Sequence, residues 1–289
     1  MAGSRGALVV FGSGPGIGRN VAAVFAERGF QKIILLSRNK TRLSQDADFV
    51  RAASAGASVD VIEYDGANIE SVRAGLEEVE KTMGNVPLEC VLFNHARLGP
   101  SKFFEFTVEE LEIDLQVSVI SLYAVAKWAM PMLLGTAKSS DTKTPSFIVT
   151  SGMLAKDPFP AMFSLAACKA GQYNLVHSLH KEYKSKGVHC ALIVVGGTVD
   201  EKMSVTNPRN IAQEIFELCG QPQGKGQLEL VLMDPEYQKH IQRREQGGNS
   251  CTYGHSQLKT GHPVRSAIHK QLNGRLVLRW VTTWESLLL

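Results

Sequence analysis

Glycine recurs near the start of the chain at a spacing that suits phosphate binding. The loop Gly12-Ser13-Gly14-Pro15-Gly16-Ile17-Gly18 lies between an apolar run, Ala7–Phe11, and a segment of helical period, Ile17–Gly29. Glycine allows a sharp turn and a close approach of the backbone to a ligand. The following helix offers free N–H groups and its positive dipole end to a pyrophosphate. A tight turn without a ligand is the alternative, but the context predicts a dinucleotide site formed by Gly12, Ser13, Gly14, Gly16, Ile17 and Gly18.

The end of the next apolar run, Lys32–Ser37, indicates which dinucleotide is bound. Sites that prefer NAD place a carboxylate there, where it bonds the ribose hydroxyls. Here the run continues as Ser37-Arg38-Asn39, without an acid. Arg38 can make charge-assisted hydrogen bonds to a ribose 2′-phosphate, with help from Ser37, Asn39 or Lys40. A solvated arginine is the alternative, but the missing acid favours NADP(H) over NAD(H).

Apolar runs of strand length alternate along the chain with longer segments of helical period. The runs are Ala7–Phe11, Lys32–Ser37, Ser58–Glu63, Leu88–Asn94, Ser146–Ser151, Val188–Val195 and Leu228–Met233. The segments between them are Ile17–Gly29, Lys40–Ala55, Ile69–Met83, Val108–Leu134, Ala161–Lys186 and Pro208–Cys219. Continuous Val/Ile/Leu runs are typical of strands buried on both faces. The alternation predicts an α/β fold with one Rossmann-type, doubly wound parallel sheet of about seven strands flanked by helices.

The charge of the chain is unevenly distributed. The 289 residues carry a net charge of +3, with 31 Lys/Arg and 28 Asp/Glu. The stretch from Glu236 to Leu289 has 8 Lys/Arg and 3 Asp/Glu, which leaves 23 basic and 25 acidic residues in the body before it. A nucleic-acid binder is expected to concentrate positive charge on its folded domain. The distribution argues against a nucleic-acid partner.

Several sequence features bear on metal binding and location. The cysteines of the chain form no CxxC pair and no cluster with histidine at a spacing typical of zinc sites. This pattern predicts reduced thiols and no metal site. Met1–Gly6 is too short and polar for a signal sequence. The longest apolar stretch, Leu115–Gly135, is interrupted by Gln116 and Lys127, so we expect a buried or interface helix and no membrane span. These features predict a cytoplasmic protein.

The chain changes character after Asp234. We expect residues 1–235 to form the NAD(P)-binding domain and residues 236–289 to form an atypical, loosely ordered C-terminal extension. Gln246–Leu289 has scattered Gly, Ser and His and a poorly periodic apolar pattern. A translated gene-model error would give the same pattern, and the sequence does not separate the two explanations.

From about Ala7 to Met233 the chain resembles the short-chain dehydrogenase/reductase family. Gly12, Gly16 and Gly18 match the glycines of the family's TGxxxGxG loop, with Phe11 at the threonine position. Further matches are Asp65, which resembles the acid that bonds the adenine amino group, Asn94-His95-Ala96-Arg97 at the NNAG motif, and Val195-Gly196-Gly197-Thr198 at the loop that meets the nicotinamide. The resemblance implies that Asp65, Asn94, Lys169, Gly197 and Thr198 belong to the cofactor site.

The resemblance also implies a catalytic set that this chain has largely lost. The family uses a tyrosine as general acid or base, a lysine four residues later, a serine that polarises the carbonyl and an asparagine that supports a water relay. In Ser164-Leu165-Ala166-Ala167-Cys168-Lys169 the lysine is retained, but Leu165 stands at the tyrosine position. Gly152 stands at the serine position and Ser118 at the asparagine position. A leucine cannot transfer a proton, so the usual carbonyl reduction cannot run in the usual way.

Other side chains near these segments could supply a proton. Shifting the register by one residue would place Ser151 and Ser164 at the serine and tyrosine positions, but serine is a poor general acid near neutral pH. The other candidates are His95, Tyr123, Lys127 and Asp157. A loop histidine, a helix-packing tyrosine and a turn aspartate before Pro158 are the simpler explanations for His95, Tyr123 and Asp157.

The sequence favours an NADP(H)-dependent oxidoreductase of a small organic carbonyl, alcohol or activated double bond, with specialised metabolism as a setting by analogy. The alternatives are a cofactor-binding pseudoenzyme or scaffold, and a fold repurposed for non-redox chemistry such as isomerisation. The short connection Val199–Asn207 leaves little chain to cover a substrate, so an open pocket is expected. The resemblance implies a homodimer or homotetramer formed through Val108–Leu134 and Ala161–Lys186.

Overall fold

The computed structural model describes residues 5–139 and 144–247, and these form a seven-stranded sheet in the order β3-β2-β1-β4-β5-β6-β7. All neighbouring strands are parallel. The strands are β1 (Arg5–Phe11), β2 (Phe30–Ser37), β3 (Ser58–Glu63), β4 (Leu88–Phe93), β5 (Ser146–Gly152), β6 (His189–Gly196) and β7 (Glu229–Met233). The predicted Rossmann-type sheet is confirmed. Its strand order reverses between β1 and β4, and ligands of such sheets bind beyond the carboxyl ends of the strands at this point.

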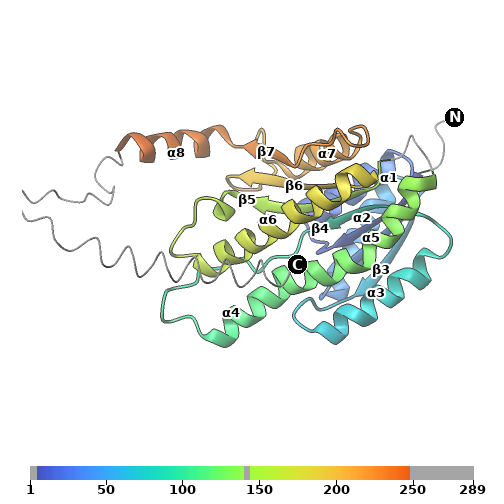
Figure 1. The fold of residues 1–289 in the computed structure, drawn as a ribbon, viewed down its shortest axis with the longest axis horizontal. Coiled ribbons are helices and arrows are strands. Elements are labelled where there is room, and N and C mark those ends of the chain that lie inside the picture. Colours follow the sequence, from blue (N-terminus) through green and yellow to red (C-terminus); the bar gives the residue numbers. More distant parts are fainter. Residues whose placement is uncertain (1–4, 140–143, 248–289) are drawn as a thin grey trace, which may run out of the picture. The chain divides into compact units, whose positions relative to one another are not determined.

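Helices cover both faces of the sheet (Figure 1). One layer contains α1 (Ile17–Glu27), α2 (Lys40–Ala53) and α7 (Pro208–Cys219), and the other contains α3 (Ile69–Met83), α5 (Ser121–Ser139) and α6 (Phe163–Tyr183). Consecutive side chains of a strand point to opposite faces. In β1, Val9 and Phe11 pack under the second layer, whereas Leu8 and Val10 pack under the first. Both faces of the sheet are therefore core.

The long apolar segment predicted as one helix has three parts. It comprises α4 (Val108–Leu115), a π-helical turn (Gln116–Ile120) and α5. By length and composition alone, Val108–Ser139 could cross a membrane. Its inner face, including Leu122, Val125 and Ala129, is buried in the core beside β4. The buried inner face agrees with the expectation of a buried or interface helix, and the cytoplasmic location stays a prediction.

A further helix, α8 (Pro235–Gly247), follows the last strand. Its first turn is capped by Asp234, whose Oδ1 accepts hydrogen bonds from the backbone N–H groups of Glu236 and Tyr237. Aspartate before a helix and proline at its first position are good start signals, and both are present here. This helix crosses the expected boundary at residue 235. The domain boundary stays a prediction, and the expected tail beyond residue 247 lies outside the described residues.

Candidate functional site

The glycine loop after β1 combines positions that need glycine for packing with positions that face open space. A Cβ atom at Gly18 would lie 2.9 Å from the carbonyl oxygen of Gly12, and Gly12 itself has a φ of 89°. At Gly14 and Gly16 an added Cβ would meet nothing within 4 Å. Helix α1 starts at Ile17, directly after Gly16, and no side chain caps its first turn. The loop thus presents uncovered backbone at the N-terminus of a helix.

A buried hydrogen bond ties this loop to α2. The hydroxyl of Ser13 donates to Oδ2 of Asp46 at 2.8 Å, and Asp46 is buried. Burial raises the pKa of Asp46, while the Ser13 hydrogen bond and the charges of Arg19 and Arg42 oppose that rise. The Ser13 side chain is therefore occupied by the protein. The sequence did not identify Asp46 as a partner of Ser13, because no sequence pattern connects a loop residue with a residue in a distant helix.

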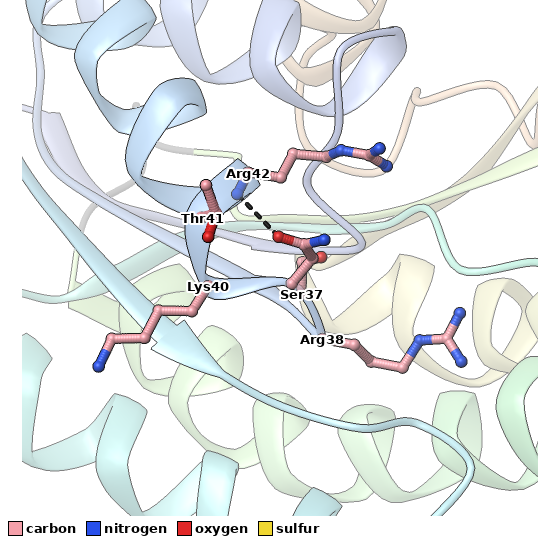
Figure 2. Close-up of a pocket in the computed structure, with 6 residues that line it drawn as sticks. Ser37, Arg38, Lys40, Thr41 and Arg42 are labelled. Atoms are coloured by element: carbon pink, nitrogen blue, oxygen red, sulfur yellow. Dashed lines mark hydrogen bonds between the residues drawn. The ribbon is translucent and has the colours of Figure 1, made fainter.

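A pocket of about 610 Å³ lies between the end of β2 and the start of α2 (Figure 2). Its lining is the continuous segment Ser37, Arg38, Asn39, Lys40, Thr41 and Arg42, which has three cationic side chains and no acid. Figure 2 shows the side chains of Arg38, Lys40 and Arg42 extending in different directions around it. The side chain of Asn39 caps α2 by accepting from the N–H of Arg42 at 2.9 Å. The pocket is suited to an anion.

The carboxyl ends of the central strands are joined through Asn94. Its Nδ2 donates to the carbonyl of Gly12 at 3.0 Å, and its Oδ1 accepts from the hydroxyl of Thr150 at 2.8 Å. Asp65 lies beyond β3, where its Oδ1 accepts from the N–H of Ala67 at 3.1 Å. Asn94 thus fixes the relative positions of β1, β4 and β5, and it brings the glycine loop next to the end of β5.

Lys169 is buried on α6 and faces the end of β5. Its Nζ donates to the carbonyl of Thr150 at 2.8 Å and to Oε1 of Gln172 at 3.0 Å. Burial lowers the pKa of Lys169 to about 8. The motif in the sequence identifies the lysine but not Gln172, although a polar residue three positions along the same helix lies on the same face.

His95 is neutral near pH 7, which argues against a role as a proton donor. Burial, together with the charges of Arg38 and Lys169, lowers the pKa of His95 to about 4. Its ring centroid lies 5.0 Å from that of Tyr64 and 5.4 Å from that of Phe93. Within the described part of the chain its Nδ1 has no hydrogen-bond partner. The imidazole is a half-buried packing group beside the glycine loop.

The two serine candidates differ in what they contact. The hydroxyl of Ser164 donates to Oδ2 of buried Asp114. Asp114 also accepts hydrogen bonds from Nε and Nη2 of Arg97, at 2.5 and 3.0 Å. Ser151 is buried, and its hydroxyl has no partner among the residues that the structure describes. The proton of Ser164 is therefore committed to a carboxylate, and sequence reasoning did not foresee this Arg97–Asp114–Ser164 network.

The positions to which the resemblance assigns the family's catalytic residues carry no acidic side chain. Leu165 is 6% exposed and packs in the interior, and a Cβ atom at Gly152 would lie 3.3 Å from the carbonyl of Val195. Ser118 is buried in the π-helical turn.

Tyr123, for which helix packing was the simpler explanation, is 58% exposed on α5. Lys127 is also exposed there, and Asp157 lies in the loop before α6.

The loop after β6 completes this edge of the sheet. Gly197 has a φ of 119°, and a Cβ atom there would lie 2.8 Å from Cβ of Asp234, so this position requires glycine. The carbonyl of Thr198 accepts from the hydroxyl of Thr206 at 2.7 Å. Residues 198–207 contain turns and no helix. In the described part of the chain, no group of three His, Cys, Asp or Glu side chains could hold a metal ion.

Comparisons with known proteins agree with this fold. An uncharacterized oxidoreductase of Staphylococcus aureus (strain MRSA252) is 25% identical over 233 residues, which cover 78% of this chain and 95% of the relative. The NADPH-bound short chain oxidoreductase of Pseudomonas aeruginosa PAO1, which contains an atypical catalytic center, gives a TM-score of 0.68 at 22% identity and covers 79% of this chain and 95% of its own. An NADH-dependent reductase complexed with NAD gives 0.65 at 18% identity, with coverages of 80% and 96%.

The family itself is shown by sequence. Residues 7–210 match the sequence profile of the short chain dehydrogenases, which is more than half of the 289 residues. The two structural neighbours show that this fold is shared at low identity. The chain belongs to the short-chain dehydrogenase family of oxidoreductases.

Proposed function

We propose that this chain is an NADP(H)-dependent oxidoreductase of small organic molecules. The observation that supports this cofactor most strongly is the pocket after β2, which Arg38, Lys40 and Arg42 line without an acidic residue. A phosphate monoester carries nearly two negative charges near neutral pH, and guanidinium groups bind it through paired hydrogen bonds. One structural neighbour holds NADPH and another holds NAD, so the preference rests on the residues of this pocket.

The remaining cofactor residues fit the rest of a dinucleotide. The uncovered backbone at Gly14 and Gly16, at the start of α1, suits a pyrophosphate. Asp65 would bond the adenine amino group, and Lys169 would hold a ribose. Asn94 would keep the strand ends in place around the cofactor. Gly12, Ser13, Ile17 and Gly18 shape the first loop, and Gly197 and Thr198 would meet the nicotinamide.

The bound cofactor would supply or accept a hydride, and the residues of this chain limit what else the site does. Leu165 and Gly152 have no proton to give, His95 is neutral, and Ser164 is bonded to Asp114. The residues of this chain therefore bind and orient the reactants, and a substrate must tolerate hydride transfer without a strong protein acid. An activated double bond, whose product takes its proton from water, fits this site better than a simple ketone.

Turnover tests this proposal. We expect purified protein to consume NADPH with conjugated carbonyl compounds, and we expect Lys169→Ala to abolish the reaction. A protein that binds NADPH but consumes none with carbonyls or activated alkenes would be the pseudoenzyme, which the buried Leu165 favours. Conversion of a substrate without any change in NADPH would support non-redox chemistry in the same pocket.

We also propose that the chain forms a homodimer or homotetramer through the α4–α5 segment. Four apolar side chains on it are well exposed: Val108, Ile113, Ile120 and Tyr123, at 68%, 49%, 48% and 58%. Exposed apolar groups that gather on one segment are typical of contact surfaces. Light scattering should give two or four times 31.5 kDa for the wild type, and Ile120→Asp should lower that mass. A monomeric wild type would contradict the proposal.

A further inference from the structure

Gln172 is a fully buried amide whose hydrogen bonds all stay inside the protein. Its Oε1 accepts from Nζ of Lys169 at 3.0 Å, and its Nε2 donates to the carbonyl of Ser118 at 2.8 Å. The same Nε2 lies 3.4 Å from the carbonyl of His95. Gln172 is 0% exposed. One side chain thus joins α6 to the π-helical turn and to the loop after β4.

These contacts determine how the Lys169 ammonium is placed. An ammonium has three N–H donors, and two of them go to the carbonyl of Thr150 and to Gln172. One donor remains for a ligand. The titratable groups that interact electrostatically with the Lys169 ammonium are Cys168, on the same helix, and His95, after β4. Burial raises the pKa of the Cys168 thiol and lowers that of His95, so both are neutral near pH 7. The charge of Lys169 is therefore stabilised by two neutral acceptors.

The same contacts leave no route for proton transfer on the inner side of the Lys169 ammonium, which is the side that faces Gln172 and the carbonyl of Thr150. A side-chain amide has no titratable proton near neutral pH, so Gln172 cannot take a proton from Lys169 and pass it on. The carbonyls of Thr150 and Ser118 already accept hydrogen bonds from Lys169 and Gln172. Water behind the ammonium would have to displace one of these bonds.

We propose that Gln172 is a positioning residue that fixes the Lys169 ammonium with one N–H directed to the cofactor ribose and blocks proton exchange on its inner side. The ribose in this statement rests on the proposed function, whereas the link between Gln172 and Lys169 does not. The lysine of this chain is accordingly an anchor for the cofactor and no part of a proton path.

The test measures the titration of Lys169 by NMR in the full chain, labelled with ¹³C-lysine and assigned by the signal lost in Lys169→Met. Gln172→Leu removes an acceptor at similar volume, so the titration midpoint should fall by about one pH unit. Gln172→Glu adds a negative charge, so the midpoint should rise. Asn174→Ala, exposed on the same helix, should leave it unchanged. Equal midpoints in wild type, Gln172→Leu and Gln172→Glu would overturn the proposal, and Gln172→Glu decides if Gln172→Leu does not fold.

A titration with NADPH tests the ribose part separately. Gln172→Leu should bind NADPH roughly tenfold more weakly than wild type, and Asn174→Ala should bind equally well. A shifted Lys169 midpoint with unchanged NADPH affinity would overturn the positioning role toward the ribose. If the wild type does not bind NADPH at all, the proposed function fails, while the NMR titration still decides whether Gln172 sets the state of Lys169.

Discussion

A Cβ atom at position 12 would lie 2.4 Å from Cδ2 of His95. It would also lie 2.9 Å from the backbone of Asn94, and the φ of 89° is unfavourable for any other residue. Gly12 is therefore required by the packing of the protein itself, independently of a ligand. His95 fills the space that a side chain would need.

This contact predicts that Gly12→Ala destabilises the protein by about 3 kcal/mol, because backbone strain and steric overlap add. Gly14→Ala is the matched control, since an added Cβ there meets nothing within 4 Å. We expect Gly14→Ala to keep its melting temperature and to weaken NADPH binding. Urea unfolding and NADPH titration of both variants check this, and a Gly12→Ala protein as stable as wild type would contradict it.

The Arg97–Asp114–Ser164 network predicts a second loss of stability. Asp114→Ala leaves the buried hydroxyl of Ser164 and the partly exposed guanidinium of Arg97 without their acceptor, and we expect a cost of about 2 kcal/mol. Ser164→Ala removes one hydrogen bond and should cost about 1 kcal/mol. Urea denaturation measures both changes. If Asp114→Ala lowered the free energy of unfolding no more than Ser164→Ala does, the carboxylate would not be the centre of the network.

Lys169 predicts a pH dependence of stability. Its pKa of about 8 lies below the ordinary value of 10.5, so the unfolded chain binds more protons between these values and stability rises with pH there. Below pH 8 the cost of burying the charge is fully present, at about 3 kcal/mol. Unfolding free energies of wild type and Lys169→Met should differ least near pH 10.5. A difference that stays constant across this window would contradict a lowered pKa.

Restoring the family's proton donors predicts a gain of activity. Leu165→Tyr with Gly152→Ser places a phenol and a hydroxyl at the positions that the resemblance assigns to catalysis, and the new serine Cβ would lie 3.3 Å from the carbonyl of Val195, a tight but adjustable contact. General acid catalysis contributes roughly a hundredfold or more in rate. We expect the double variant to reduce simple ketones at least that much faster than wild type. A wild type that already reduces them equally fast would show that Leu165 is no obstacle.

Local patterns in the sequence were sufficient for the fold. The continuous apolar runs and the crossover segments each fall on an observed strand or helix, because each side chain's burial repeats with the period of its own element. The π-helical turn at Gln116–Ile120 was not predicted, because a single shifted turn does not change the apolar period enough to be visible. Helix α8 was missed although Asp234-Pro235 carries its start signal.

Site residues that are adjacent in the sequence could be predicted, whereas contacts between residues far apart in the sequence could not. Arg38 and its neighbours form one continuous segment, so the cationic pocket follows from the sequence. The bonds of Ser13 to Asp46 and of Ser164 to Asp114 join residues 33 and 50 positions apart, which only the folded sheet brings together. Gln172 is close to Lys169 along the chain, but its other partners, Ser118 and His95, are distant.

A fluorescence titration with NADPH and NADH tests the cofactor preference of the protein. Wild type should bind NADPH more tightly than NADH. Arg38→Ala should weaken NADPH binding roughly ten- to a hundredfold, with little effect on NADH, because it removes a charge-assisted bond to the 2′-phosphate. Arg73→Ala, exposed on α3, is the control and should change neither. Equal affinity for both cofactors in wild type, unchanged in Arg38→Ala, would show that Arg38 does not select NADP(H).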